Sequence, residues 1–126
     1  MADVVVTVPK ALWQTWIDEG DAVGEPYSGE LWSFYLYGAR PKIRRGERVY
    51  VVAHGRLRGY APLSYVEDEG PPGGRFALVR RGGAVAVTID EPIRGFRGWR
   101  ERWWDRDAER PFPIWRTEGV DALALA

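Results

Sequence analysis

The sequence predicts a small, mainly β protein of the α+β type, built as a β-barrel with two short flanking helices. Two observations carry this prediction. About six short runs of β-branched and other apolar residues are separated by glycine- and proline-containing turns, and two further segments have apolar residues at helical spacing. The chain has 126 residues, of which 45% are hydrophobic, enough for one domain with its own core. We therefore expect one domain over residues 1–126, with a tryptophan-rich helix and tail at about 94–126.

The first two predicted elements are a strand and an amphipathic helix. Residues 2–8 are almost continuously β-branched, which predicts a buried strand. Pro9 ends this strand and suits the first turn of a helix, and Gly20 suits its end. One side of the helix carries the apolar residues Leu12, Trp13, Trp16 and Ile17. We expect this side, with Trp13 or Trp16, to pack in the core.

A hairpin is predicted near the middle of the chain. His54 and Gly55 form a two-residue turn between an apolar strand at 48–53 and a longer strand at 56–66. Side chains alternate between the two faces of a strand, so Arg56 and Arg58 are expected to project together from one sheet surface.

The remaining elements follow from local composition. A strand is predicted at 31–37, and a second strand pair at 76–81 and 84–89 across the glycines at 82–83. Loops are predicted at 21–29, 67–74 and 94–98. The segment 99–110, which Pro111 ends, is predicted as the second helix because its tryptophans recur at helical spacing.

Positive charge gathers in one part of a chain whose net charge is zero. Residues 40–58 hold seven cations against Glu47 alone, a local charge of +6. A nucleic-acid site requires cations that contact phosphates and flat rings that stack on bases. Taken singly, each cation also fits a solvated strand or turn edge. The candidate nucleic-acid-binding residues are Arg40, Lys42, Arg44, Arg45, Arg56, Arg58, Tyr60 and Trp104, with Trp104 expected to be exposed.

Composition excludes several other functions. The chain has no cysteine and a single histidine, His54, which excludes disulfides, thiolate-ligated zinc and multi-histidine metal sites. It has neither a phosphate-binding loop motif nor a dinucleotide-binding motif, so no cofactor is expected. Its apolar runs are too short for a signal peptide or a membrane span, which predicts a cytoplasmic protein. The near absence of asparagine and glutamine is similar to thermophile compositions.

The order of elements resembles the PUA-like barrel superfamily, in particular its ASCH-type branch. Residues 46–50 (GERVY) carry the resemblance, together with the glycine-containing hairpin and Gly59-Tyr60, and it extends over roughly residues 2–90. The resemblance implies a small closed barrel with a cleft between the barrel and the first helix. Many members of the superfamily bind RNA, modified bases or nucleotides. We therefore expect RNA or a nucleotide-like ligand to bind, without catalysis, in the cleft between the first helix and residues 40–60.

Two alternatives remain open. Some members of the superfamily resemble amidohydrolases that act on a modified nucleoside through a lysine, a threonine and a glutamate. That set does not map onto this chain, so an enzyme would need Lys42 or His54 beside Glu47 or Glu30. The other alternative is a protein interaction module that uses the tryptophan-rich segment. Its contact residues would be Trp99, Trp103, Trp104, Phe112 and Trp115.

Overall fold

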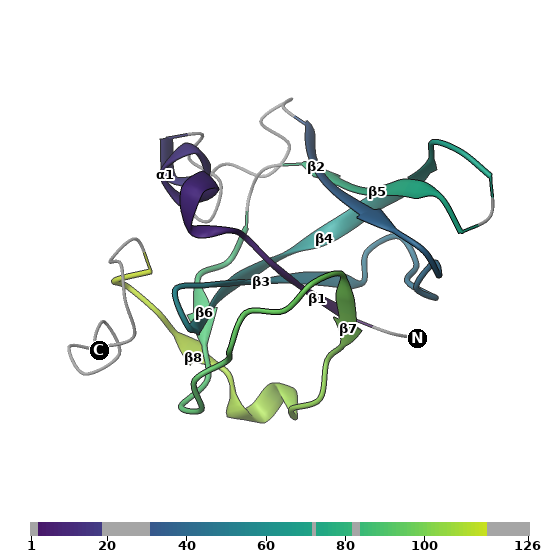
Figure 1. Cartoon of the computed structure of the whole chain (residues 1–126). Helices are drawn as coiled ribbons and strands as arrows, with labels where there is room; N and C mark the ends of the chain where they lie inside the picture. Colours follow the sequence, from purple (N-terminus) through teal and green to yellow (C-terminus); the bar gives the residue numbers. More distant parts are fainter. Residues whose placement is uncertain (1–2, 19–30, 72, 82–83, 116–126) are drawn as a thin grey trace.

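A six-stranded sheet that curls into a half-barrel forms the body of the described structure (Figure 1). The computed structural model describes residues 3–18, 31–71, 73–81 and 84–115. In spatial order the strands of this sheet are β2 (Leu31–Tyr37), β5 (Arg75–Arg81), β4 (Arg56–Asp68), β3 (Arg48–Ala53), β1 (Val4–Thr7) and β7 (Trp99–Glu101). A second, two-stranded sheet pairs β6 (Val87–Thr88) with β8 (Arg110–Pro111). The predicted mainly β class is confirmed.

The described sheet is open rather than closed. Its edges are β2 and β7, and no pairing between them is present among the described strands. β1 pairs in parallel with β3 and antiparallel with β7, whereas β2 pairs antiparallel with β5. The closed barrel that the resemblance implies is therefore a half-barrel with a seam between its edge strands, β2 and β7.

The predicted first helix is present as α1 (Lys10–Asp18). It starts directly after Pro9, whose carbonyl accepts a 2.9 Å hydrogen bond from the Leu12 N–H. Trp13 is fully buried, as expected for the apolar side, whereas Leu12 is 55% exposed. The predicted stop at Gly20 and the loop at 21–29 lie outside the described residues.

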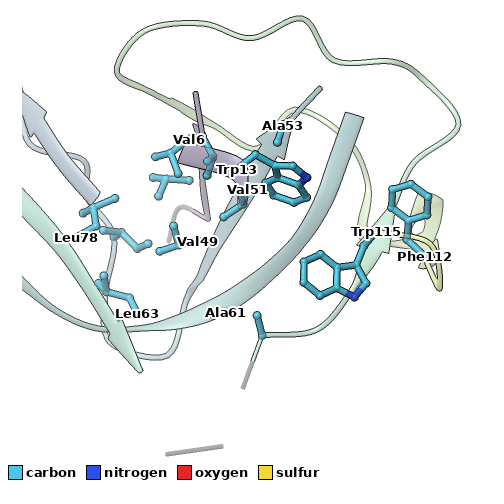
Figure 2. Close-up of a cluster of buried hydrophobic side chains, with 14 of the residues drawn as sticks. Val6, Trp13, Val49, Val51, Ala53, Ala61, Leu63, Leu78, Phe112 and Trp115 are labelled. Carbon is cyan, nitrogen blue, oxygen red and sulfur yellow. The ribbon is translucent and has the colours of Figure 1, made fainter. Parts of the chain in front are cut away.

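Both faces of the central strands are buried, which explains their continuous apolar sequences. Val4 and Val6 belong to one core cluster, whereas Val5 between them belongs to another. Figure 2 shows the first cluster, in which the rings of Trp13 and Trp115 meet edge to face at 5.9 Å. Figure 1 shows α1 above β3 and the segment from β6 to β8 below it. The half-barrel therefore has a cover on each side.

The β3–β4 hairpin is present, but its arginines lie inside the protein. His54 and Gly55 have φ values of 48° and 73°, and a bulge opposite Val51 and Val52 adds Arg58 to β4. Arg56 is 7% exposed and Arg58 is fully buried, so the expectation that both project from the sheet surface was wrong. The reason is that the covers on both sides of the half-barrel leave no open sheet surface at this end of β4.

A glycine in β4 permits close approach of the chain that follows β5. A Cβ atom at Gly59 would lie 2.6 Å from the Val85 carbonyl oxygen, closer than real Cβ contacts allow. Next to it, Tyr60 and Val85 exchange two backbone hydrogen bonds of 3.0 and 2.8 Å. Residues 84–89 therefore run against β4 and β8 and do not pair with β5, which corrects the predicted strand pair with 76–81.

The predicted helix at 99–110 was also wrong. Its first residues form β7, which pairs with β1, and the short 3-10 helix η1 (Arg106–Ala108) follows. Asp105 caps η1 by accepting a 3.0 Å hydrogen bond from the Asp107 N–H. Helical spacing of tryptophans favoured a helix locally, but pairing with the otherwise free edge of β1 provides backbone hydrogen bonds together with burial.

Replacement of Arg58 by alanine is expected to lower the free energy of unfolding by about 3 kcal/mol or more. The Arg58 guanidinium donates 2.8 and 3.1 Å hydrogen bonds to the carbonyls of Ala53 and Trp115, and it lies 5.3 Å from the centre of the Phe112 ring. Its loss leaves both buried carbonyls without these donors. Chemical denaturation followed by tryptophan fluorescence measures the effect.

The control for this prediction is Arg45→Ala, because Arg45 is exposed. We expect that variant to change the free energy of unfolding by no more than about 0.5 kcal/mol. An R58A protein as stable as R45A would contradict the structural role given to the buried guanidinium.

Candidate ligand-binding groove

The predicted binding residues do not gather round one hollow. Arg40 donates hydrogen bonds to the carbonyls of Gly38 and Gly74 at 2.7 and 2.8 Å and forms a 2.6 Å ion pair with Asp68. It therefore joins the turn after β2 to the β4–β5 connection. Three other predicted cations are exposed on the chain between β2 and β3: Lys42, Arg44 and Arg45.

The other four predicted residues are packed within the protein or against it. Arg56 donates a 2.6 Å hydrogen bond to the Asp90 carbonyl, and burial, followed by repulsion from Arg110, lowers its pKa. Burial, followed by repulsion from Arg56, lowers the pKa of Arg58 to about 10, which leaves it charged at neutral pH. Tyr60 is half-buried beneath the Arg48 guanidinium, at 4.0 Å. Trp104 is only 8% exposed, so the expectation that it is exposed was wrong.

Trp104 is buried because it belongs to a polar cluster around Glu109. The Glu109 carboxylate accepts hydrogen bonds from Trp104 Nε1 at 2.9 Å, from the Tyr50 hydroxyl at 2.5 Å and from Arg48 at 3.0 Å. Burial and the bond to Glu109 raise the pKa of Tyr50 above its ordinary value of 10, so its hydroxyl keeps its proton. This cluster holds the segment after β7 against β3.

A second ionic cluster holds the same segment against β1. The Asp3 carboxylate, whose side chain is 3% exposed, forms ion pairs with Arg102 at 3.1 Å and Arg106 at 2.8 Å. It also accepts a 2.9 Å hydrogen bond from the Arg48 N–H. Burial by itself would raise the pKa of Asp3. The bonds from Arg48, Arg106 and Arg102 outweigh burial, and the net pKa is lowered.

The structure contains a groove of about 660 Å³ at the seam of the half-barrel, a volume typical of small-molecule sites. It lies between the end of β1 with the start of α1, the strand β2, and the glycine-spaced turn at 95–98. Its lining residues are Val6, Thr7, Pro9, Leu12, Ser33, Phe34, Tyr35, Leu36, Gly95, Phe96, Arg97 and Gly98.

Hydrogen bonds hold the turn that forms one wall of this groove. The Phe96 N–H donates to the Thr7 hydroxyl at 3.2 Å, and a Cβ atom at Gly95 would lie 3.2 Å from the Thr7 methyl group. At the other end of the turn, Trp99 Nε1 donates to the Ala39 carbonyl at 2.8 Å. These contacts join the turn to β1 on one side and to the chain after β2 on the other.

The groove has aromatic walls and a cationic rim. Tyr35 is 51% exposed, while Phe34 and Phe96 are half-buried. Arg97 is the charged residue in the lining, and no acidic residue lines the groove in the described part of the chain. Further exposed cations flank it: Lys10 next to Pro9, Arg94 next to Gly95, and Arg100, whose guanidinium lies 4.4 Å from the centre of the Phe96 ring.

Among the described residues these cations have no carboxylate partner, as is also true of the exposed Lys42, Arg44 and Arg45. By contrast, Arg48, Arg75, Arg102 and Arg110 each form an ion pair with a carboxylate. Within residues 3–18, 31–71, 73–81 and 84–115, no ion pair involves Lys10, Arg94, Arg97 or Arg100. No carboxylate of the described residues therefore neutralises these charges.

These groove residues were not predicted from the sequence. The resemblance implied a cleft beside the first helix, but its opposite wall was expected at residues 40–60. The available signal was RGFRG at 94–98, in which two arginines flank a phenylalanine between glycines. That signal was interpreted only as a turn. Which strand the turn would contact depended on the pairing of β7 with β1.

Of the residue pairs that the enzymatic alternative allows, His54 with Glu47 is not brought together. His54 follows β3 and Glu47 precedes it, so the strand's six residues separate them by roughly 20 Å. Glu47 accepts a 2.7 Å hydrogen bond from the Arg44 N–H, and the His54 ring lies 6.0 Å from that of Trp13. Glu30 lies outside the described residues.

The described residues contain neither a cluster of metal ligands nor a helix that could span a membrane. No group of three or more histidine, cysteine, aspartate or glutamate side chains there is placed to hold a metal ion. α1, the α-helix of the described part, is far too short to cross a bilayer, and no other helix there meets the length and apolarity required.

The lowered pKa of Asp3 predicts a specific loss of stability in acid. A carboxylate with a depressed pKa in the folded state stabilises the fold above its unfolded value of 3.8, and this contribution is lost as pH falls further. At neutral pH we expect Asp3→Asn to lower the free energy of unfolding by about 1–3 kcal/mol. The difference from the native chain should shrink below pH 3.8. Denaturant titrations across this pH range measure it, and a difference that stays constant in acid would contradict the assignment.

Comparison with known proteins gives no relative: no family model, no curated protein and no solved structure matches this chain.

Proposed function

We propose that this protein binds single-stranded RNA, or a nucleotide-like ligand, in the groove between β1, β2 and the 95–98 turn, without catalysing a reaction. The observation that carries the proposal is the combination of exposed and half-buried rings with cations that lack ion-pair partners in the described chain. Cations meet phosphates, and flat rings stack on unpaired bases, which a duplex does not offer in the same way.

The shape of the molecule supports this proposal. The resemblance to PUA-like barrels of the ASCH type implies a ligand cleft beside the first helix, and the groove lies beside α1. Its volume of about 660 Å³ suits a nucleotide rather than a long stretch of polymer. Other nucleotides of a strand would lie outside the groove, where Lys10 and Arg94 flank it.

Charge supports an anionic ligand over a neutral one. The described lining contains Arg97 and no acid, although acidic and basic residues are equally numerous in the chain, at 18 each.

The proposal moves the site away from Arg44 and Arg45. These two residues precede β3, whose first residue, Arg48, contacts Asp3 at the start of β1. The groove contacts Thr7, at the opposite end of β1. Arg44 and Arg45 therefore lie toward one end of β1, and Arg94 and Arg97 lie toward the other. Substitution of one pair can be compared directly with substitution of the other.

Arg94→Ala with Arg97→Ala should weaken binding of a short labelled oligouridylate about tenfold at about 50 mM salt. The dependence of log K on log salt should become less steep by about 1.4, because each lost contact to a single strand contributes about 0.7. Fluorescence anisotropy over a range of salt concentrations measures both quantities.

The matched control is Arg44→Ala with Arg45→Ala, which removes the same charge at the other end of β1. We expect it to retain near-native affinity and a near-native salt slope. If the control loses as much affinity as R94A/R97A, the site is not the groove. If the native protein shows no salt-dependent binding, the nucleic-acid proposal fails.

A further inference from the structure

The free edge of β2 borders the groove. Neither ring stacking nor the cations of the proposed site use its backbone groups. β2 pairs with β5 in an unbroken antiparallel register from Leu31 to Tyr37. Just beyond it, the Gly38 N–H donates to the Gly74 carbonyl at 3.2 Å. This bond shows that the backbone groups of the even-numbered residues of β2 point toward β5. Backbone groups of alternate residues point to opposite sides of a strand. The N–H and C=O groups of Ser33 and Tyr35 therefore point away from β5.

Those outward groups lie at the groove. Ser33 and Tyr35 both line it, and both are exposed. Among the residues that the structure describes, no backbone hydrogen bond reaches the outer edge of β2 at these positions. Each residue therefore presents one donor and one acceptor side by side to whatever occupies the seam.

We propose that the main chain of Ser33 and Tyr35 reads the hydrogen-bonding edge of an unpaired base, while Arg94 and Arg97 hold its phosphate. This inference rests on the proposed function and deepens it. The edge of an unpaired base also presents adjacent donors and acceptors, which the N–H and C=O of one strand residue can match. The flat rings of Phe34 and Phe96 lie in the same groove.

This arrangement makes the site selective for single strands. In a duplex the Watson–Crick edges of the bases are already paired, so they cannot reach the edge of β2. An extended peptide could also add to a free strand edge. A neutral peptide, however, would leave the charges of Lys10, Arg94, Arg97 and Arg100 without partners. The flat rings of Phe34 and Phe96 also offer faces on which bases stack, so the observations favour an anion that carries bases.

The test compares three ligands of equal length and charge on the native full chain. They are an oligouridylate, the same oligomer with N3-methyluridine, and its abasic ribose-phosphate counterpart. N3-methylation removes the donor of the base edge and keeps the ring and the phosphate. We expect the methylated and abasic oligomers to bind about fivefold or more weakly than the oligouridylate.

A pair of variants tests the protein side of the same contact. Ser33→Pro removes the outward N–H, a change that an edge strand tolerates when that N–H has no ladder partner, and Ser33→Ala keeps it. We expect S33P to bind oligouridylate about fivefold more weakly and S33A to bind it like the native chain. Circular dichroism establishes that S33P is folded. If it is not, the three ligands on the native chain decide the question.

The outcomes separate this inference from the proposed function. If all three oligomers bind equally and with salt dependence, the main-chain reading is wrong and the groove recognises only phosphate. If none binds, the proposed function fails as well. If an extended peptide, and no oligonucleotide, protects the Ser33 and Tyr35 amides from hydrogen exchange, β2 is a strand-addition edge and the inference is overturned.

Discussion

The architecture depends on buried charged groups that fasten the returning chain at 84–115 to the half-barrel. Asp3 forms ion pairs with Arg102 and Arg106. Glu109 accepts hydrogen bonds from Arg48, Tyr50 and Trp104. On the other face of the sheet, Arg58 bonds to the Trp115 carbonyl. A buried charge is tolerated only where partners satisfy it, so these groups specify one position for the segment.

This fastening creates the candidate site. With β7 held against β1, the turn at 95–98 contacts Thr7 and faces β2 across the open seam. A closed barrel would pair the free edge of β2 and fill this space with a strand. The seam instead combines apolar walls, main-chain groups that no described residue bonds, and a rim of cations. These are the three kinds of contact that a base-bearing anion requires.

Local patterns predicted the elements whose environment is local. Apolar residues at helical spacing predicted the burial of Trp13. Pro9 predicted the helix that starts at Lys10, and Gly55 predicted the hairpin at His54. Patterns failed where distant partners decide. Arg58 and Trp104 are buried because Ala53, Trp115 and Glu109 accept their hydrogen bonds. The segment after Trp99 pairs with β1 although its spacing suits a helix. The groove combines three distant segments, so no single motif could indicate it.

Photo-crosslinking is the most direct test of where a ligand lies. A short oligonucleotide that carries 4-thiouridine is bound at low salt and irradiated, and the attached peptide is identified by mass spectrometry. We predict attachment within residues 33–36 or 95–98, the two ring-bearing walls of the groove. Attachment confined to residues 40–45, or no specific attachment, would contradict the placement of the site at the seam.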